Sequence, residues 1–78
     1  MRYRIIANEE TAKGFALFGA EAVAVSNKEQ ARAALEEALH DSSLGAVVLS
    51  KETGEMLAAE VFSHDASCRL PQVLVLDV

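Results

Sequence analysis

Side chains that could bind a metal or act as nucleophiles gather in one short segment near the carboxyl end. Ser63, His64, Asp65 and Cys68 all fall in this segment. A zinc site needs three or four suitably arranged ligands, and the whole chain has one cysteine and two histidines. We therefore interpret these residues as part of a solvated polar connection at His64–Arg69. The sequence predicts no catalytic residue, no metal site and no cofactor site.

Polar side chains also follow two predicted strands, at Asn8–Glu10 and at Ser50–Glu52. Ligands of doubly wound folds bind at such carboxyl ends of strands. A phosphate cradle needs glycine where the next helix begins, and the stretch ANEETAKG has none there. A phosphorylated receiver domain needs an aspartate at the end of its third strand, where this chain has Leu49-Ser50. A receiver-like or small-ligand-binding signalling domain without the phosphoacceptor is the alternative to a non-enzymatic interaction subunit.

Composition excludes several other classes. With 78 residues the chain predicts one domain, residues 1–78, and 51% of its residues are hydrophobic, enough for a core. A net charge of −5 with scattered Lys and Arg argues against nucleic-acid binding. The single cysteine fits a reducing compartment. The amino-terminal MRYRIIANEE is no signal peptide, and no apolar run is long enough to span a bilayer. We expect a cytoplasmic protein, or the cytoplasmic part of a larger one, without direct membrane insertion.

Strand-like and helix-like patterns alternate along the chain. The capping-box motif Ser26-Asn27-Lys28-Glu29 predicts a helix start, with the Ser26 hydroxyl and the Glu29 carboxylate as reciprocal caps. Pro71 precedes the last strand, where a missing N–H is tolerated. The predicted strands are 3–7, 22–25, 45–49 and 73–76, and the predicted helices are 11–18, 26–40 and 50–62.

Two of these helices carry specific expectations. In the second, Arg32 and Glu36 are four residues apart and predict an ion pair. In the third, Gly54 favours a start after that residue. Its inward side chains are predicted to be Met56, Leu57, Val61 and Phe62.

The alternation predicts an α/β fold: a small, doubly wound, four-stranded parallel sheet in the order 2-1-3-4, flavodoxin- or receiver-like, with three layers. Right-handed crossovers then place the first helix alone on one face. That face stays uncovered over the last two strands, which are apolar at every position, and such a patch marks an interface. We predict Val47, Leu49, Val73 and Val75 as its partner-binding residues. Leu74 and Leu76 fit equally. Both sets of alternate residues in the strand are apolar, so the pattern does not reveal which side is covered.

The most individual segment is Gly14–Gly19. We interpret Phe15 as the anchor of the first helix on the sheet and Gly19 as its left-handed turn residue. Gly14 is assigned a packing role with them. Contact with a partner is the alternative.

At this segment the sequence resembles the F-subunit family of the V-type and archaeal A-type ATPases. The likeness rests on Asn8–Thr11 after a strand, then Gly14–Gly19 against the family's G-F-x-L-x-G type pattern. It continues through Glu29-Gln30-Ala31 with Leu35, through the third strand with Ser50–Glu52, and to Pro71. The motifs are short, but their order covers essentially the whole chain.

The resemblance implies a non-catalytic rotor subunit of the central stalk, beside the coiled-coil D subunit and other ATPase subunits. Its role would be to couple ATP hydrolysis or synthesis to proton or sodium transport, on the membrane-bound complex. Family members usually continue past the fourth strand into a carboxyl-terminal helix. This sequence stops at Val78, so we expect that helix to be absent.

Overall fold

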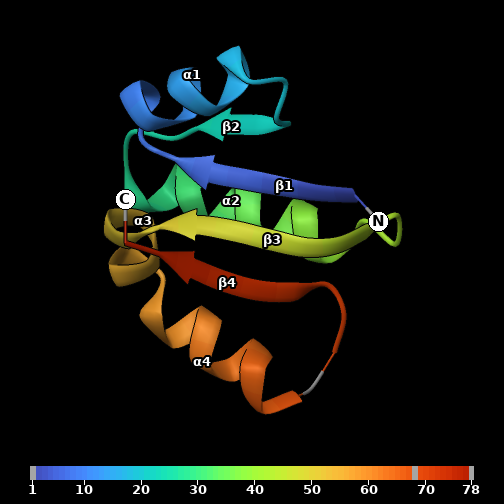
Figure 1. Ribbon diagram of the computed structural model, residues 1–78. Helices are drawn as coiled ribbons and strands as arrows, with labels where there is room; N and C mark the ends of the chain where they lie inside the picture. Colours follow the sequence, from blue (N-terminus) through green and yellow to red (C-terminus); the bar gives the residue numbers. More distant parts are fainter. Residues whose placement is uncertain (1, 68, 78) are drawn as a thin grey trace.

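The computed structural model describes residues 2–67 and 69–77. Four strands form one parallel sheet in the order β2-β1-β3-β4, which confirms the predicted topology (Figure 1). The elements, in chain order, are β1 (Arg2–Ala7), α1 (Glu9–Leu17), β2 (Ala22–Ala24), α2 (Lys28–Leu39), β3 (Leu44–Ser50), α3 (Lys51–Met56), α4 (Ala58–Ser67) and β4 (Gln72–Leu76).

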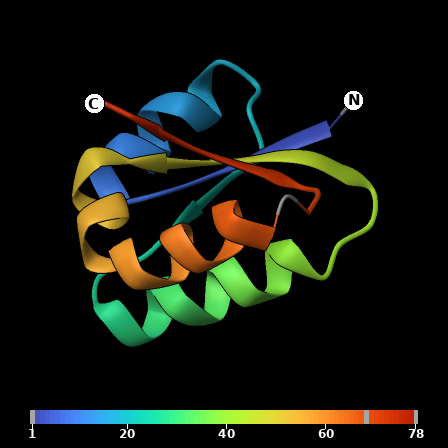
Figure 2. The same cartoon turned by 90° about the horizontal axis from the view of Figure 1, so that it is seen from below.

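The helices divide unequally between the two faces of the sheet. Figure 2 shows α2 and α4 below the sheet and α1 alone above it. On its face α1 packs on β1 and β2, whereas α2 packs on β1 and β3 and α4 on β4. Among the described residues, no helix covers β3 and β4 on the α1 side. The handedness argument predicted this half-covered sheet.

Each face has its own apolar cluster, because side chains of a strand alternate between faces. The larger cluster lies under α2, α3 and α4 and includes the fully buried Ile6, Leu35, Val47, Leu49 and Leu57. The smaller one joins strand and helix residues on the other face: Ile5, Ala7 and Ala12, with Phe15, Ala20, Ala22 and Val48 against them.

The helical segment between β3 and β4 differs from the prediction. It forms two helices that meet at the fully buried Leu57. The Leu57 N–H still donates to the Thr53 carbonyl at 3.1 Å, and its own carbonyl accepts from the Val61 N–H at 2.9 Å. The second helix points Phe62 into solvent rather than inward, and it extends to Ser67 through most of the predicted polar connection.

Gly54 lies inside α3, so the expectation of a helix start after it was wrong. A Cβ built at Gly54 would lie 2.7 Å from Cγ1 of Val75 on β4. Real Cβ atoms do not approach so closely. Glycine at this position therefore lets α3 lie directly against the last strand, which offsets its poor helix propensity.

The cap of α2 lies one residue later than predicted. Asn27, not Ser26, is the N-cap, and its Oδ1 accepts from the Gln30 N–H at 2.9 Å. The Gln30 side chain in turn accepts from the Ser26 N–H at 2.9 Å. Serine and asparagine both cap well, so the motif alone did not decide between them. Glu29 lies exposed in the first turn, where its charge suits the helix dipole.

Candidate functional site

The carboxyl ends of β1 and β3 are adjacent, as a switch-point site requires, but their polar side chains cap helices. The Asn8 Oδ1 accepts from the Thr11 N–H at 2.8 Å. At the end of β3, the Ser50 hydroxyl donates to the Thr53 hydroxyl at 2.9 Å, and both residues are buried. The position at which a receiver domain has its phosphoacceptor is thus taken by a buried serine in a local hydrogen bond.

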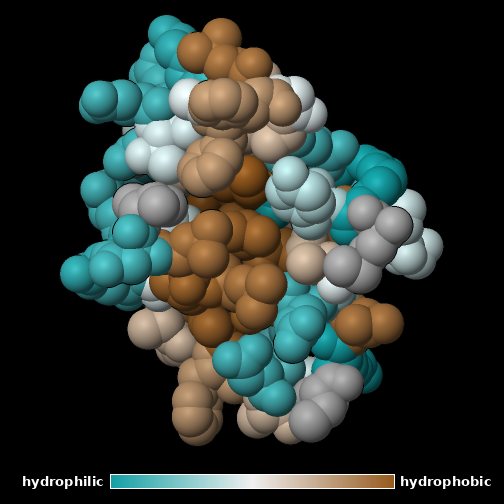
Figure 3. Space-filling model, in the orientation of Figure 1, coloured by the Kyte–Doolittle hydropathy of each residue, from teal (hydrophilic) through white to brown (hydrophobic). Residues whose placement is uncertain are grey.

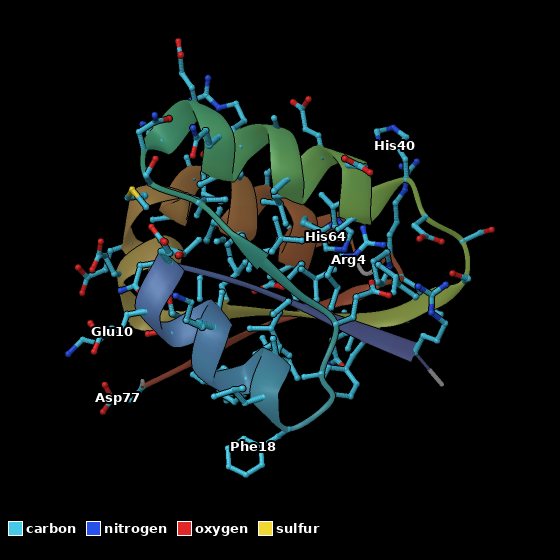
Figure 4. All side chains as sticks on the ribbon, turned by 90° about the horizontal axis from the view of Figure 1, so that it is seen from above. Arg4, Glu10, Phe18, His40, His64 and Asp77 are labelled. Carbon is cyan, nitrogen blue, oxygen red and sulfur yellow. The ribbon has the colours of Figure 1, made fainter. Side chains whose placement is uncertain are left out.

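Around these caps lies an acidic rim, which we define as Glu9, Glu10, Glu52 and Asp77. All four residues are exposed. Asp77 lies 3.7 Å from the Nζ of Lys51. No ion pair within residues 2–67 and 69–77 involves the three glutamates. Figure 4 shows Glu10 and Asp77 projecting outward from the same edge of the sheet.

At the opposite edge, an ion-pair network joins the start of β1 to two loops. Arg4 Nε lies 2.5 Å from Glu21 Oε2, and its Nη2 lies 3.3 Å from Asp41 Oδ2. Arg2 Nη2 lies 2.6 Å from the other Glu21 oxygen. Sequence reasoning missed this network. The signal for it is the spacing of Arg2 and Arg4, which places both on one face of a strand.

The network shifts three pKa values. The hydrogen bonds from Arg4 and Arg2 lower the pKa of Glu21. The hydroxyl and N–H of Ser43, which donate to Asp41, lower the pKa of that carboxyl. The Glu21 carboxylate raises the pKa of the Arg4 guanidinium. Glu21 and Arg4 favour each other's charged forms across the fold, whereas Asp41 is favoured chiefly by Ser43 in its own turn.

In the segment with the possible metal and nucleophile residues, the described side chains of His64 and Ser67 make hydrogen bonds to backbone carbonyls. His64 lies on α4, and its Nε2 is 2.6 Å from the Pro71 carbonyl oxygen, so it fastens α4 to the approach to β4 rather than lying in a solvated loop. Cys68 lies outside the described residues. Within the part of the chain that the structure describes, no three His, Cys, Asp or Glu side chains are placed to hold a metal ion.

A groove of about 630 Å³ separates α2 from α4. Its walls are joined by Arg32 and Glu60, whose Nε and Oε2 lie 3.4 Å apart. Arg32 was predicted to pair with Glu36, but α4 brings Glu60 to it. Leu35 and Leu39 line the groove together with charged residues of both signs, including Lys28 and Glu36.

The uncovered part of the sheet is apolar. We define the open face as the side chains of β1, β3 and β4 on the α1 side: Tyr3, Ile5, Ala46, Val48, Leu74 and Leu76. Tyr3, Leu74 and Leu76 are 47%, 43% and 41% exposed, respectively. Figure 3 views this side and shows a continuous hydrophobic patch at its centre.

None of the four predicted partner-binding residues lies on this face. Val47, Leu49 and Val73 are buried in the cluster under the helices. Val75 is half exposed at the sheet edge, but its methyl groups lie against Gly54 of α3. The open side carries the other parity, which includes Leu74 and Leu76. The helices α2, α3 and α4 take one face, so the residues beneath them are unavailable to a partner.

The residues of the Gly14–Gly19 segment have separate roles. Phe15 packs on the smaller apolar cluster, and Gly19 has a φ of +86° in the turn after α1. A Cβ at Gly14 would meet nothing within 4 Å, so packing does not require glycine there. Phe18 is 91% exposed and projects from the α1 side of the sheet (Figure 4).

Pro71, which was predicted to precede the last strand, is buried directly before β4, after a cis peptide bond.

None of the described helices is long and apolar enough to cross a membrane.

No curated protein matches the chain significantly. Among solved structures, the fold is similar to that of the F subunit of the V-type ATP synthase of Archaeoglobus fulgidus, with a TM-score of 0.75 and 20% sequence identity. The alignment covers 96% of this chain and 95% of that one. The sequence model for ATP synthase (F/14-kDa) subunits matches residues 4–77. Since this match spans nearly all of the sequence, the chain belongs to the family of ATP synthase (F/14-kDa) subunits.

Proposed function

We propose that the chain is a non-catalytic subunit of the central stalk of a rotary V/A-type ATPase, where it couples ATP hydrolysis or synthesis to proton or sodium transport. The observation that carries the proposal is the family match over residues 4–77. The fold similarity to a V-type F subunit supports it independently.

The surface of the protein is consistent with a role in assembly. Polar groups at the carboxyl ends of the strands are engaged in helix caps, whereas three exposed large apolar side chains, Tyr3, Leu74 and Leu76, lie on the open face. A monomeric soluble protein rarely keeps such a patch without a partner. The partners that we propose are the coiled-coil D subunit and the neighbouring ATPase subunits, which would hold the protein on the cytoplasmic side of the membrane-bound complex.

Reconstitution with the cognate coiled-coil subunit tests the proposal. The two purified chains should elute together from a size-exclusion column, at micromolar concentration and physiological salt. The isolated chain should not hydrolyse ATP. Failure to form this complex would contradict the proposed function.

The coupling role needs a second measurement. ATPase complexes assembled with and without this chain should differ in the number of ions moved per ATP hydrolysed. If both complexes transport equally well, the chain has no part in coupling. Saturable binding of a phosphate analogue near Glu9 and Glu10 would instead favour a signalling domain.

A further inference from the structure

The open face lies where a fully covered sheet of this type would have a second helix beside α1. In a doubly wound sheet each face is covered by helices that lie side by side, about 8–10 Å apart. Here α1 occupies the half of its face over β1 and β2, and the half over β3 and β4 stays open. The open half has an apolar floor, including Val48, Leu74 and Leu76, and α1 as one wall. Neighbouring strands lie about 4.8 Å apart, so the two strands of the open half give it roughly the width of one helix.

Charge distinguishes the two ends of this site. The acidic rim lies at the carboxyl edge of the sheet, where Glu9, Glu10 and Glu52 have no ion-pair partner among the described residues. At the amino edge, the acids Glu21 and Asp41 are already paired with Arg2 and Arg4. A docked helix thus meets uncompensated negative charge at one end only. The amino terminus of a helix carries partial positive charge and is favoured beside anions.

We propose that the open face binds the apolar stripe of one α-helix of a partner protein, antiparallel to β3 and β4, with the helix's basic amino-terminal end over the acidic rim. The inference rests on the proposed function, in which a coiled-coil subunit supplies such a helix. It goes further by assigning the surface, the direction and the charge of the partner segment.

A second copy of this chain fits the observations less well. Each copy carries a net charge of −5, so two acidic rims brought together would repel each other. A stable dimer also buries about 800 Å² per partner, and the open face offers only three substantially exposed large side chains, Tyr3, Leu74 and Leu76. A single helix needs less area. Phe18, which projects on the same side, extends the surface beside α1.

The first test compares affinities of the full chain for the cognate coiled-coil subunit by titration calorimetry. Leu74→Glu places a carboxylate on the open face, and Phe62→Glu places one at an exposed apolar position of α4. We expect Leu74→Glu to weaken binding at least about 100-fold, because it buries an unpaired charge in the interface. Phe62→Glu should bind like the wild type, and thermal unfolding should show that both variants fold.

The second test concerns the direction of the helix. Glu10→Lys reverses a charge of the acidic rim, and Glu29→Lys reverses a matched charge in the first turn of α2. We expect only Glu10→Lys to weaken binding, by about tenfold at low salt, with the difference shrinking as salt is added. A partner whose basic residues lie at the other end of its docked helix would make Glu10→Lys neutral and overturn the assigned direction.

The outcomes separate this inference from the function on which it rests. If the wild type does not bind the coiled-coil subunit, the proposed function fails. If the wild type binds and Leu74→Glu binds equally well, the function stands and the assignment of the open face is wrong. A wild-type dimer in sedimentation that Leu74→Glu dissociates would show that a second copy covers the face, and would also overturn it.

Discussion

Two glycines in the same segment have opposite backbone requirements. Gly14 is helical, and a Cβ there would meet no atom within 4 Å. Gly19 has a φ of +86°, where a side chain is strained. Gly14→Ala should therefore raise the free energy of unfolding by about 0.5–1 kcal/mol, and Gly19→Ala should lower it by about 1–2 kcal/mol. Urea unfolding measures both. Destabilisation by Gly14→Ala would show a contact that the structure does not contain.

The carboxylate of Glu21 should make the free energy of unfolding depend on pH. Folding lowers its pKa through Arg4 and Arg2, so its contribution is fully present above the unfolded pKa of about 4.3. The contribution is lost as the pH falls through the lower, folded pKa. Glu21→Gln should therefore be less stable than the wild type at pH 7, and this difference should shrink below about pH 4. Urea midpoints across this range measure it, and a pH-independent difference would exclude the linkage. Glu55→Gln is the control, because Glu55 is exposed and outside any ion pair among the described residues.

At the scale of the element, the start of α2 depends on one amide side chain. Asn27 caps the N–H of Gln30, whereas Glu29 contributes through its charge in the first turn. Asn27→Ala should lower the free energy of unfolding by about 1 kcal/mol. Glu29→Ala should cost only the dipole contribution, about 0.3–1 kcal/mol at low salt, and less in high salt. Chemical denaturation at high ionic strength separates the two contributions. A larger loss of stability for Glu29→Ala than for Asn27→Ala would instead support Ser26 and Glu29 as reciprocal caps.

Elements also show why some features could be predicted from the sequence and others could not. Alternating apolar periods predicted the element types and, with crossover handedness, the strand order and the half-covered face. The break at Leu57 was not predicted, because neither glycine nor proline marks it and only the core contact of Leu57 explains it. The network around Arg4 joins residues distant in the chain, so no local pattern reveals Glu21 and Asp41 as its partners.

At the scale of the whole molecule, the sheet has one covered and one half-open face, and this asymmetry decides what each apolar residue does. Leu49 and Leu74 lie on neighbouring strands and are the same residue type. Nothing in either run, GAVVL or QVLVL, indicates which side of the strand is covered. The sequence therefore does not decide which alternate residues face the helices and which face the open side. In the folded protein Leu49 is fully buried and Leu74 is 43% exposed.

The two leucines should therefore separate folding from binding. Leu49→Ala creates a cavity under the helices and should lower the free energy of unfolding by about 2–5 kcal/mol, whereas Leu74→Ala removes a half-exposed side chain and should cost less than about 1 kcal/mol. For binding to the coiled-coil subunit the order should reverse, once both variants are compared well below their unfolding midpoints. Urea unfolding and titration calorimetry on the same preparations measure the two quantities. Equal losses of stability for the two variants would mean that the open face is covered from within the chain, and the reversal in binding could then not occur.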